Sequence, residues 1–226
     1  MIPCVSVENI RLSDAYTIAN YLPGLKLMYR AAWGIFKAVQ WKGSIAIVVG
    51  SGNNGGDGFA LACILREHGY DCTIFTVGQH LSHDCAHYAA KAAALCISIL
   101  PFEKNSLRGY SIVVDCLLGT GFSGKLRENY QSAIESINAS SAYVVCVDIN
   151  SGMNGDTGEA DLAVRSDLTV TIGYVKKGLV TEIAGKHIKR LVCVDIGIVL
   201  VREEGFLDEQ SCPDWLDRNI ICATDI

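Results

Sequence analysis

The sequence lacks the features that would place the chain in a membrane, secreted or nucleic-acid-binding class. No apolar run approaches the roughly 18 residues that a membrane-spanning helix requires. The first residues, Met1 to Arg11, lack the basic and then apolar parts of a signal peptide. Basic residues are not in excess, because the formal net charge is −5. This charge argues against a general binder of nucleic-acid backbones but leaves room for a local basic site.

Cysteine pairs are missing as well. The ten cysteines are scattered, and none forms a Cys-x-x-Cys pair. Many lie inside apolar segments, namely Cys63, Cys72, Cys116, Cys146 and Cys193. A reduced cysteine in such a segment packs as a small hydrophobic side chain. Since half of the residues are hydrophobic, we expect a folded, reduced, cytoplasmic protein with a large core and no membrane or nucleic-acid partner.

Apolar β-prone segments alternate with helix-like segments along the chain. The expected strands are mostly continuous apolar runs, as in a parallel sheet covered on both faces. They lie at Ser44–Val49, Cys72–Val77, Ser111–Cys116, Tyr143–Ile149, Leu168–Ile172 and Leu191–Ile196. Helices are expected at Ser6–Gln40 (an N-terminal helical segment), Gly58–His68, Asp84–Ala94 and Glu128–Asn138. This alternation predicts an α/β fold, a Rossmann-like three-layer αβα sandwich with a mostly parallel central sheet.

No repeat, low-complexity tract or linker interrupts this alternation, so we predict a single domain over residues 1–226. The segment 208–226 differs from the rest, because it contains Pro213, Trp215 and several charges. We interpret this segment as a C-terminal helix or as the start of a linker to a further domain.

A glycine-rich segment follows the first expected strand and opens a helix. It reads Gly50-Ser51-Gly52-Asn53-Asn54-Gly55-Gly56-Asp57-Gly58. Glycines let the backbone turn sharply and approach a phosphate, and the start of a helix adds free N–H groups. The Gly-x-Gly-x-x-Gly pattern alone is a weak indication. Two Asn residues and an Asp in the same turn favour a ligand-binding loop over a purely structural one.

Two common nucleotide-binding layouts do not fit this loop. In a dehydrogenase, a carboxylate at the end of the second strand usually binds the adenine ribose, whereas here Cys72–Val77 runs into Gly78-Gln79. A P-loop would have Lys followed by Ser or Thr after the glycines, and none is present. The loop is therefore predicted to bind a nucleotide without the layout used for hydride transfer.

Two further expected strands end in an aspartate that is followed by a turn. Asp115 leads to Gly119-Thr120-Gly121-Phe122-Ser123-Gly124-Lys125, and Asp148 leads through Asn150 to Ser151-Gly152. Because the carboxyl ends of parallel strands form a ligand crevice, both aspartates should converge on the glycine-rich loop. Lys125 offers a positive charge for a phosphate. The alternative role, for either aspartate alone, is to cap a helix.

Taken together, these motifs resemble those of the YjeF N-terminal domain family, the NAD(P)H-hydrate epimerases. The chain has the family's G-x-G-N-N-G-G-D-G and D-x-x-x-G-T-G motifs intact. Its segments Val147–Gly158 and Ser166–Gly178 are similar to the family's V-D-I-P-S-G-x-N-G-D-T-G and A-D-x-T-x-T-F-G-x-P-K-x-G patterns. The resemblance extends over almost the whole chain, to about Gly197.

The resemblance implies an isomerase that interconverts the R and S epimers of hydrated NADH or NADPH in nicotinamide nucleotide repair. The substrate would contact Asn53, Asn54, Gly55, Gly56, Asp57, Gly119, Thr120, Gly121, Phe122, Ser123, Gly124, Lys125 and Asp148. A potassium ion would be held by Asn54, Asp115 and Ser151, an oxygen donor set whose single carboxylate suits a large, weakly charged cation. Asp148 would be the catalytic acid/base.

The resemblance also implies partners. One is an ATP- or ADP-dependent dehydratase, fused or separate, that acts on hydrated NADH or NADPH (NADHX or NADPHX, together NAD(P)HX). The other is a second copy of the chain in a homodimer. On this interpretation residues 208–226 would lead toward a dehydratase domain that is absent from this chain. The alternative function is a non-catalytic nucleotide-binding or scaffold module of the same fold. Such a module would be expected to lose the Asn and Asp residues of the loop, which this chain retains.

Some positions depart from the family pattern or suggest other chemistry. Asn150 and Val175 replace prolines, and Tyr29-Arg30 replaces Glu-Asn. We expect Asn150 to loosen the turn that presents Ser151. His80, His83 and His87 have near-helical spacing, but the segment is typical of a loop entering a surface helix, so a zinc cluster there is disfavoured.

Overall fold

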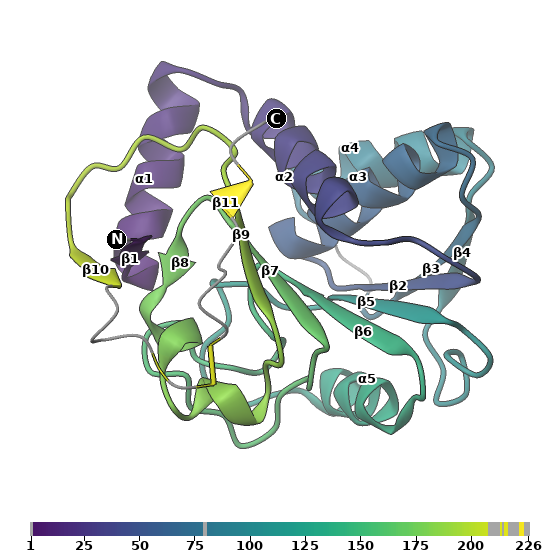
Figure 1. The fold of residues 1–226 in the computed structure, drawn as a ribbon. Helices are drawn as coiled ribbons and strands as arrows, with labels where there is room; N and C mark the ends of the chain where they lie inside the picture. The colour runs from purple at the N-terminus through teal and green to yellow at the C-terminus, as the bar shows by residue number, and fades with distance from the viewer. Residues whose placement is uncertain (1, 79–80, 208–212, 214, 217–221, 224–226) are drawn as a thin grey trace.

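The chain folds around a parallel sheet whose strand order reverses near the middle (Figure 1). The computed structural model describes residues 2–78, 81–207, 213, 215–216 and 222–223. Within these residues the sheet has eight strands in the order β11-β9-β7-β6-β5-β2-β3-β4. Their bounds are β2 Ile45–Val49, β3 Cys72–Thr76, β4 Ser98–Pro101, β5 Ile112–Cys116, β6 Tyr143–Val147, β7 Leu168–Ile172, β9 Leu191–Val194 and β11 Cys222–Ala223. The carboxyl ends of β2 and β5 thus flank a topological switch point, where α/β sheets bind ligands.

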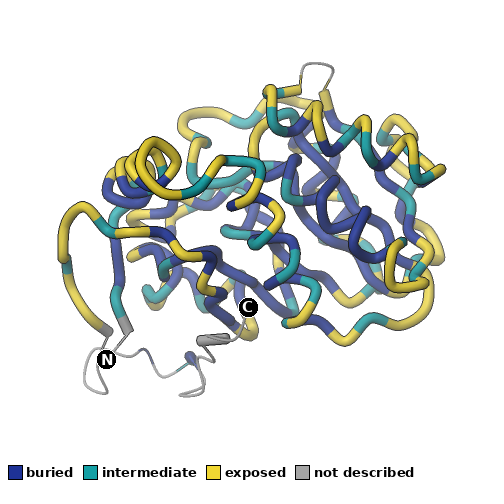
Figure 2. Tube along the Cα trace, turned by 90° about the horizontal axis from the view of Figure 1, so that it is seen from above, coloured by how far each residue is buried: buried dark blue, intermediate teal, exposed yellow. Residues whose placement is uncertain are grey.

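Helices cover both faces of this sheet. One face carries α2 (Gly24–Ala38), α3 (Asn53–Glu67) and α4 (His83–Ala94), and the other carries α5 (Glu128–Ala139) (Figure 1). Successive strand residues point to opposite faces, so Ile47 packs in the cluster with α2 to α4 while Val48 packs in the cluster with α5. The central strands are buried along their whole length (Figure 2). The predicted three-layer sandwich with a mostly parallel sheet is confirmed.

A second, three-stranded sheet holds the N-terminal segment beside the main one. It consists of β1 (Ile2–Val5), β8 (Val175–Lys176) and β10 (Gly205–Leu207). The remaining helices are α1 (Val7–Asn20), which follows β1, and the short 3-10 helices η1 (Lys177–Val180) and η2 (Ala184–Lys186). Two buried hydroxyls anchor α1. Thr17 Oγ1 accepts a hydrogen bond from Val199 N at 2.9 Å, and Ser13 Oγ accepts one from Val201 N at 3.1 Å. This sheet fixes α1 and Lys176 near the carboxyl end of the main sheet.

Several boundaries differ from those predicted from the sequence. The segment Ser6–Gln40 contains two helices rather than one helical stretch, and β4 was not predicted. Most of the segment 208–226 lies outside the described residues. Within it, Leu216 is buried and Trp215 Nε1 donates to Thr181 O at 3.0 Å, while the interpretation as a linker stays a prediction. No helix in the described part of the chain is long and apolar enough to cross a bilayer.

The helix α3 begins at Asn53, five residues earlier than the sequence predicts, with Gly52 as its N-cap. Glycine is a poor helix former, so the glycine-rich segment was expected to stay a loop up to Gly58. Packing overrides this preference. A Cβ at Gly56 would lie 2.6 Å from Met28 Cε, and one at Gly58 would lie 2.8 Å from Val49 Cγ1.

Two glycines of the loop allow contact between backbones. A Cβ at Gly50 would lie 1.9 Å from Leu117 O, and a Cβ at Gly55 would lie 2.1 Å from Gly50 O. Since both obstructing atoms belong to the main chain, they cannot move aside as a flexible side chain would. These glycines therefore set how closely the start of α3 approaches the ends of β2 and β5.

We expect Gly50→Ala and Gly55→Ala each to lower the free energy of unfolding by about 3 kcal/mol, because each added methyl group meets a main-chain carbonyl. Gly52→Ala is the matched control in the same loop, since a Cβ there meets nothing within 4 Å. That variant should lose less than about 1 kcal/mol, the cost of a poorer N-cap. Urea denaturation of the three variants measures this, and equal losses would contradict the close-approach role.

Candidate active site

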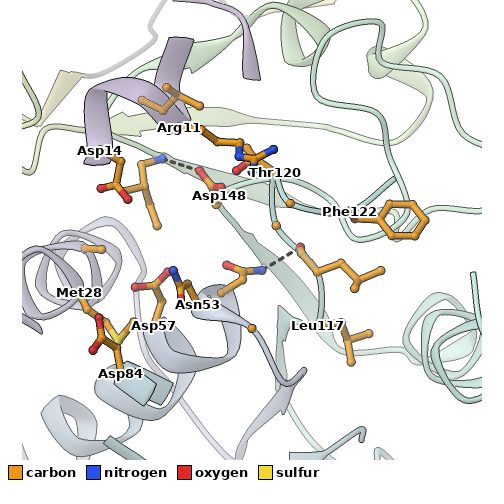
Figure 3. A pocket seen from close by; sticks show the side chains of 18 of the residues that line it. Arg11, Asp14, Met28, Asn53, Asp57, Asp84, Leu117, Thr120, Phe122 and Asp148 are labelled. Carbon is orange, nitrogen blue, oxygen red and sulfur yellow. Dashed lines mark hydrogen bonds between the residues drawn. The ribbon is translucent and has the colours of Figure 1, made fainter. Parts of the chain in front are cut away.

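A cavity of about 800 Å³ lies over the switch point of the sheet. Helices α1 and α2 form one wall, and the start of α3 and the turn after β5 form another (Figure 3). Asp148, at the end of β6, and Lys176, in β8, lie in the wall formed by the strands. The volume is within the range of pockets that enclose a small-molecule ligand.

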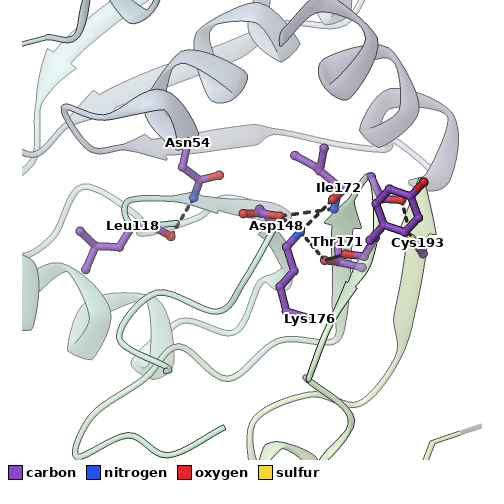
Figure 4. A network of polar contacts seen from close by, with 9 residues as sticks. Asn54, Leu118, Asp148, Thr171, Ile172, Lys176 and Cys193 are labelled. Carbon is purple, nitrogen blue, oxygen red and sulfur yellow. Dashed lines mark hydrogen bonds and ion pairs between the residues drawn. The ribbon is translucent and has the colours of Figure 1, made fainter. Parts of the chain in front are cut away.

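Asp148 reaches the cavity from an unusual backbone conformation. Its φ is 67°, in the left-handed region, and its N–H donates to Val170 O at 2.8 Å. The carboxylate forms an ion pair with Lys176, which is only 1% exposed. The ammonium group also donates to Thr171 Oγ1 at 3.1 Å and to Ile172 O at 2.8 Å (Figure 4). All three donors of this buried cation are therefore engaged, and Asp148 is held in one position.

Three more aspartates line the same cavity, namely Asp14, Asp57 and Asp84, and Oδ1 of the last of these lies 3.0 Å from His83 Nδ1 (Figure 3). Asp57 lies near the start of α3 and Asp14 lies on α1, and the carboxyl group of neither makes a hydrogen bond or ion pair with another described residue. Burial raises the pKa of Asp57 well above its usual value, and the charges of Asp148 and Asp14 add to the rise. Burial also raises the pKa of Asp14, as does the charge of Asp148, while the positive charge of Lys176 opposes the rise.

Asp115 lies behind the cavity wall at the end of β5 and is fully buried. Its two oxygens accept four hydrogen bonds. The donors are Leu117 N at 3.1 Å, Ser151 N at 2.9 Å, Ser151 Oγ at 2.6 Å and Cys146 Sγ at 3.2 Å. Burial raises the pKa of Asp115 above its usual value. The hydrogen bonds, above all the one from the Ser151 hydroxyl, offset only part of this rise. The carboxyl group therefore ties the turn after β5 to the turn after β6.

Asn54 joins this network through the backbone of Leu118. Asn54 Nδ2 donates to Leu118 O at 2.9 Å, and Leu118 N donates to Ser151 Oγ at 2.9 Å (Figure 4). The other side-chain atom, Asn54 Oδ1, is buried and has no hydrogen-bond partner in the described structure. A buried amide oxygen without a partner is rare in folded proteins and indicates that a donor or a cation belongs beside it.

The structure brings most of the predicted site residues to one place. The predicted residues that line the cavity are Asn53, Asn54, Asp57, Gly119, Thr120, Gly121, Phe122, Ser123, Lys125 and Asp148. Gly55 and Gly56 are buried behind the lining, where they serve the packing of α3, and Gly124 does not line the cavity either. Asp115 and Ser151 lie behind the wall. The binding and metal roles of all these residues stay predictions.

Sequence reasoning missed two residues of the site, Lys176 and Asp14. Lys176 lies in a family-like segment that was recognised, but its pairing with Asp148 depends on the small sheet, whose strands have two to four residues and leave almost no sequence pattern. Asp14 lies four residues after Ile10 on α1, so that the two share one face of the helix. This helical spacing between an apolar residue and Asp14 is the sequence pattern that could have identified Asp14.

The expectation that Asn150 loosens the turn after β6 is wrong. Asn150 is fully buried, and its Nδ2 lies within hydrogen-bonding distance of Val164 O (2.9 Å), Ser166 Oγ (3.1 Å) and His187 O (3.2 Å). Its Oδ1 accepts the hydroxyl of Thr169 at 2.6 Å. Where a proline would stiffen the turn through its ring, this asparagine fixes it through side-chain hydrogen bonds to three segments.

The histidines considered for a zinc cluster do not come together with other ligands in the described residues. His83 and His87 are exposed on α4, and His83 Nδ1 lies 3.0 Å from Asp84 Oδ1. His80 lies outside the described residues.

Comparison with known families settles where the chain belongs. The family model described as "YjeF-related protein N-terminus" matches residues 24–178, more than half of the chain. The chain belongs to this YjeF-related family. The matched range contains the glycine-rich loop, Asp115, Asp148 and Lys176, whereas Asp14 precedes it.

Two relatives and one solved structure are similar to most of the chain. A bifunctional NAD(P)H-hydrate repair enzyme of Coxiella burnetii is 36% identical over 200 residues, which cover 84% of this chain but 41% of that protein. An NAD(P)H-hydrate epimerase of Limosilactobacillus fermentum is 32% identical over 206 residues, with 84% of this chain and 95% of that protein covered. The crystal structure of yeast ynu0 has a TM-score of 0.69 at 18% identity, covers 77% of this chain and 82% of its own, and supports the fold.

We expect Asn150→Ala to lower the free energy of unfolding by about 3 kcal/mol, because the Thr169 hydroxyl and the carbonyls of Val164 and His187 lose a buried partner. Asn20→Ala, at an exposed position of α1, should change it by less than about 0.5 kcal/mol. Chemical denaturation measures both variants. Equal effects would show that the buried hydrogen bonds of Asn150 do not fix the turn.

Proposed function

We propose that this protein is an NAD(P)H-hydrate epimerase, an isomerase that interconverts the R and S epimers of hydrated NADH and NADPH. The observation that carries the proposal is the cavity at the switch point, where the Asp148–Lys176 ion pair faces the glycine-rich start of α3. A relative with this name is covered almost completely by the chain. The retained Asn54 and Asp57 favour this function over a non-catalytic scaffold, which would have no use for them.

The phosphates of the dinucleotide would bind at the start of α3 and at the turn after β5. The first N–H groups of a helix have no partner within the helix and attract anions. Gly52 and Asn53 lie at that point and line the cavity, as does Lys125 of the turn. Arg11 and Arg127 add positive charge around the cavity. This arrangement leaves the carboxyl-rich part of the cavity to the nicotinamide ring.

The chemistry takes place at C6 of the hydrated ring, which carries a hydroxyl and is bonded to the ring nitrogen. When the hydroxyl is protonated and leaves as water, the nitrogen lone pair forms an iminium cation. Water then adds to either face of C6 and loses a proton, which restores the hydroxyl with the R or the S configuration. This reaction needs a proton-transferring group and negative charge near the cation. Asp148, held in place by Lys176, supplies both in this proposal.

A potassium ion at Asn54, Asp115 and Ser151 is part of the proposal. The orphaned Asn54 Oδ1, the Ser151 hydroxyl and a single carboxylate form a donor set that fits a large monovalent cation. Asp115 contributes mainly its charge, because both of its oxygens already accept hydrogen bonds. When bound, the ion would balance this buried charge and stiffen the turn that carries Gly119.

A dehydratase is the proposed functional partner. The Coxiella relative is named a bifunctional repair enzyme, and this chain spans 41% of its length. An epimerase is useful beside an enzyme that accepts one epimer, because it converts the other into substrate. A homodimer and a cytoplasmic location stay predictions.

We expect Asp148→Asn to slow epimerisation by about 10²–10⁴-fold, because the amide cannot transfer a proton to or from the oxygen on C6. The assay supplies R-NADHX with an S-specific dehydratase and follows its disappearance by chromatography. Dinucleotide binding, measured by calorimetry, should persist. Asp161→Asn, at an exposed position outside the cavity, is the matched control and should keep the wild-type rate. Full activity of the Asp148 variant would refute its role in proton transfer.

We expect K⁺ to raise the melting temperature of the wild-type protein by a few degrees relative to tetramethylammonium at equal ionic strength, since a ligand that binds only the folded state stabilises it. Asn54→Leu removes the orphaned oxygen and should abolish this difference, whereas Asn54→Asp keeps an oxygen and should retain it. Asn53→Leu, next to the site, should retain it too. The same K⁺ effect in all four proteins would place the ion elsewhere.

A further inference from the structure

The cavity contains more acidic groups than the Asp148–Lys176 ion pair explains. Asp14, Asp57 and Asp84 line it as well, and Lys176 has no donor left for any of them. Asp57 belongs to the glycine-rich loop, where it is close to the proposed phosphate site. Asp14 is different, because it comes from α1, which is attached to the main fold through the small sheet and precedes the range matched by the family model.

Asp14 projects from a helix wall, while Asp148 projects from the strand ends (Figure 3). Asp14 is half-buried, and its carboxyl group has no hydrogen-bond or ion-pair partner among the residues that the structure describes. The apolar side chains of Ile10 and Ile18 flank it along the cavity face of α1. A carboxyl group in such surroundings is available to a ligand, since no protein group competes for its proton or its oxygens.

Epimerisation at C6 poses a geometric problem that a single carboxyl does not solve. The hydroxyl leaves from one face of the ring, and water must add to the opposite face. A carboxyl fixed on one side of a bound ring reaches one face only. Asp148 is fixed in this way, because its backbone and carboxylate are both held by hydrogen bonds. A second proton-transferring group on another wall of the cavity would serve the other face.

We propose that Asp14 is this second group, so that Asp14 and Asp148 act on opposite faces of the hydrated nicotinamide ring. The inference rests on the proposed function. In one direction Asp14 gives its proton to the C6 hydroxyl while the C6–O bond breaks, and the nitrogen lone pair forms the iminium bond. Water then adds to the other face of C6 and gives a proton to the Asp148 carboxylate. The reverse direction starts with the proton on Asp148, and solvent in the cavity returns the proton between turnovers.

The charges around Asp14 agree with this division of roles. Asp148 and Lys176 face it from the strand ends, Asp57 from α3, Asp84 from α4, and Arg11 is its neighbour on α1. Burial raises the pKa of Asp14, the negative charges of Asp148 and Asp84 raise it further, and Lys176 lowers it. A carboxyl with a raised pKa keeps its proton to higher pH, so the activity that needs this proton is present below that pKa and is lost above it.

The test is Asp14→Asn, assayed as a function of pH in both directions with purified R- and S-NADHX. We expect the rate to fall by about 10²–10⁴-fold in both directions, with an unchanged equilibrium ratio and unchanged dinucleotide binding. The wild-type rate should decline at high pH as Asp14 ionises, and the residual rate of the variant should lack this decline. Asp14→Glu, which keeps a carboxyl group, should retain the decline and more of the rate.

Glu8→Gln is the matched control, since Glu8 lies on the same helix, is exposed and does not line the cavity. It should behave as the wild type. A wild-type rate in Asp14→Asn, or a high-pH decline that survives the substitution, would overturn the role of Asp14 and leave the epimerase function intact. Should the Asn variant not fold, a wild-type rate and pH profile in Asp14→Ala, or a Glu variant with no decline, would overturn it equally. A wild-type protein that does not interconvert the epimers would refute the proposed function itself.

Discussion

The site depends on one buried carboxyl group. Asp115 has no exposed surface and accepts four hydrogen bonds from residues of the turns after β5 and β6 and from β6 itself. Such a group is stable in a protein interior only when its oxygens are satisfied, so the turns cannot separate without leaving it unpaired. Through Ser151 and Leu118 the same network reaches Asn54 in the first turn of α3. The position of the helix start relative to the strand ends follows from this network and from the glycine contacts beneath it.

Much of this arrangement could be predicted from the sequence because it rests on strong, local patterns. Continuous apolar runs identified the central strands, and an aspartate or a glycine-rich turn after each of three strands indicated which edge carries the site. Parallel topology then requires that Asp115, Asp148 and the loop meet. The start of α3 could not be predicted in this way, since helix propensity argues against glycine. Only the close packing around Gly56 and Gly58, where a Cβ would meet Met28 or Val49, shows why glycines occupy this helix.

The parts that escaped prediction depend on contacts between distant segments. Lys176 meets Asp148 because β8 pairs with β1, and two paired residues per strand leave no periodicity to detect. Asp14 reaches the cavity because backbone groups more than 180 residues away bond the hydroxyls of Ser13 and Thr17. The error about Asn150 has the same origin. A missing proline suggested a loose turn, yet the replacing side chain found partners in three segments that the local sequence does not reveal.

The distribution of charge in the cavity matches the two ends of a dinucleotide in different ways. Phosphates need positive charge, and Lys125, Arg11 and Arg127 provide it together with the start of α3. An iminium ring needs the opposite, and four aspartates with one buried lysine among the lining residues leave negative charge in the part of the cavity near Asp148. Without a ligand negative charge here is unfavourable, because burial and then the neighbouring carboxylates raise the pKa values of Asp14 and Asp57. On the proposed function, a cation formed beside these carboxyls would relieve the cost, so the cavity would favour the charged intermediate over the neutral hydrated ring, as electrostatic catalysis requires.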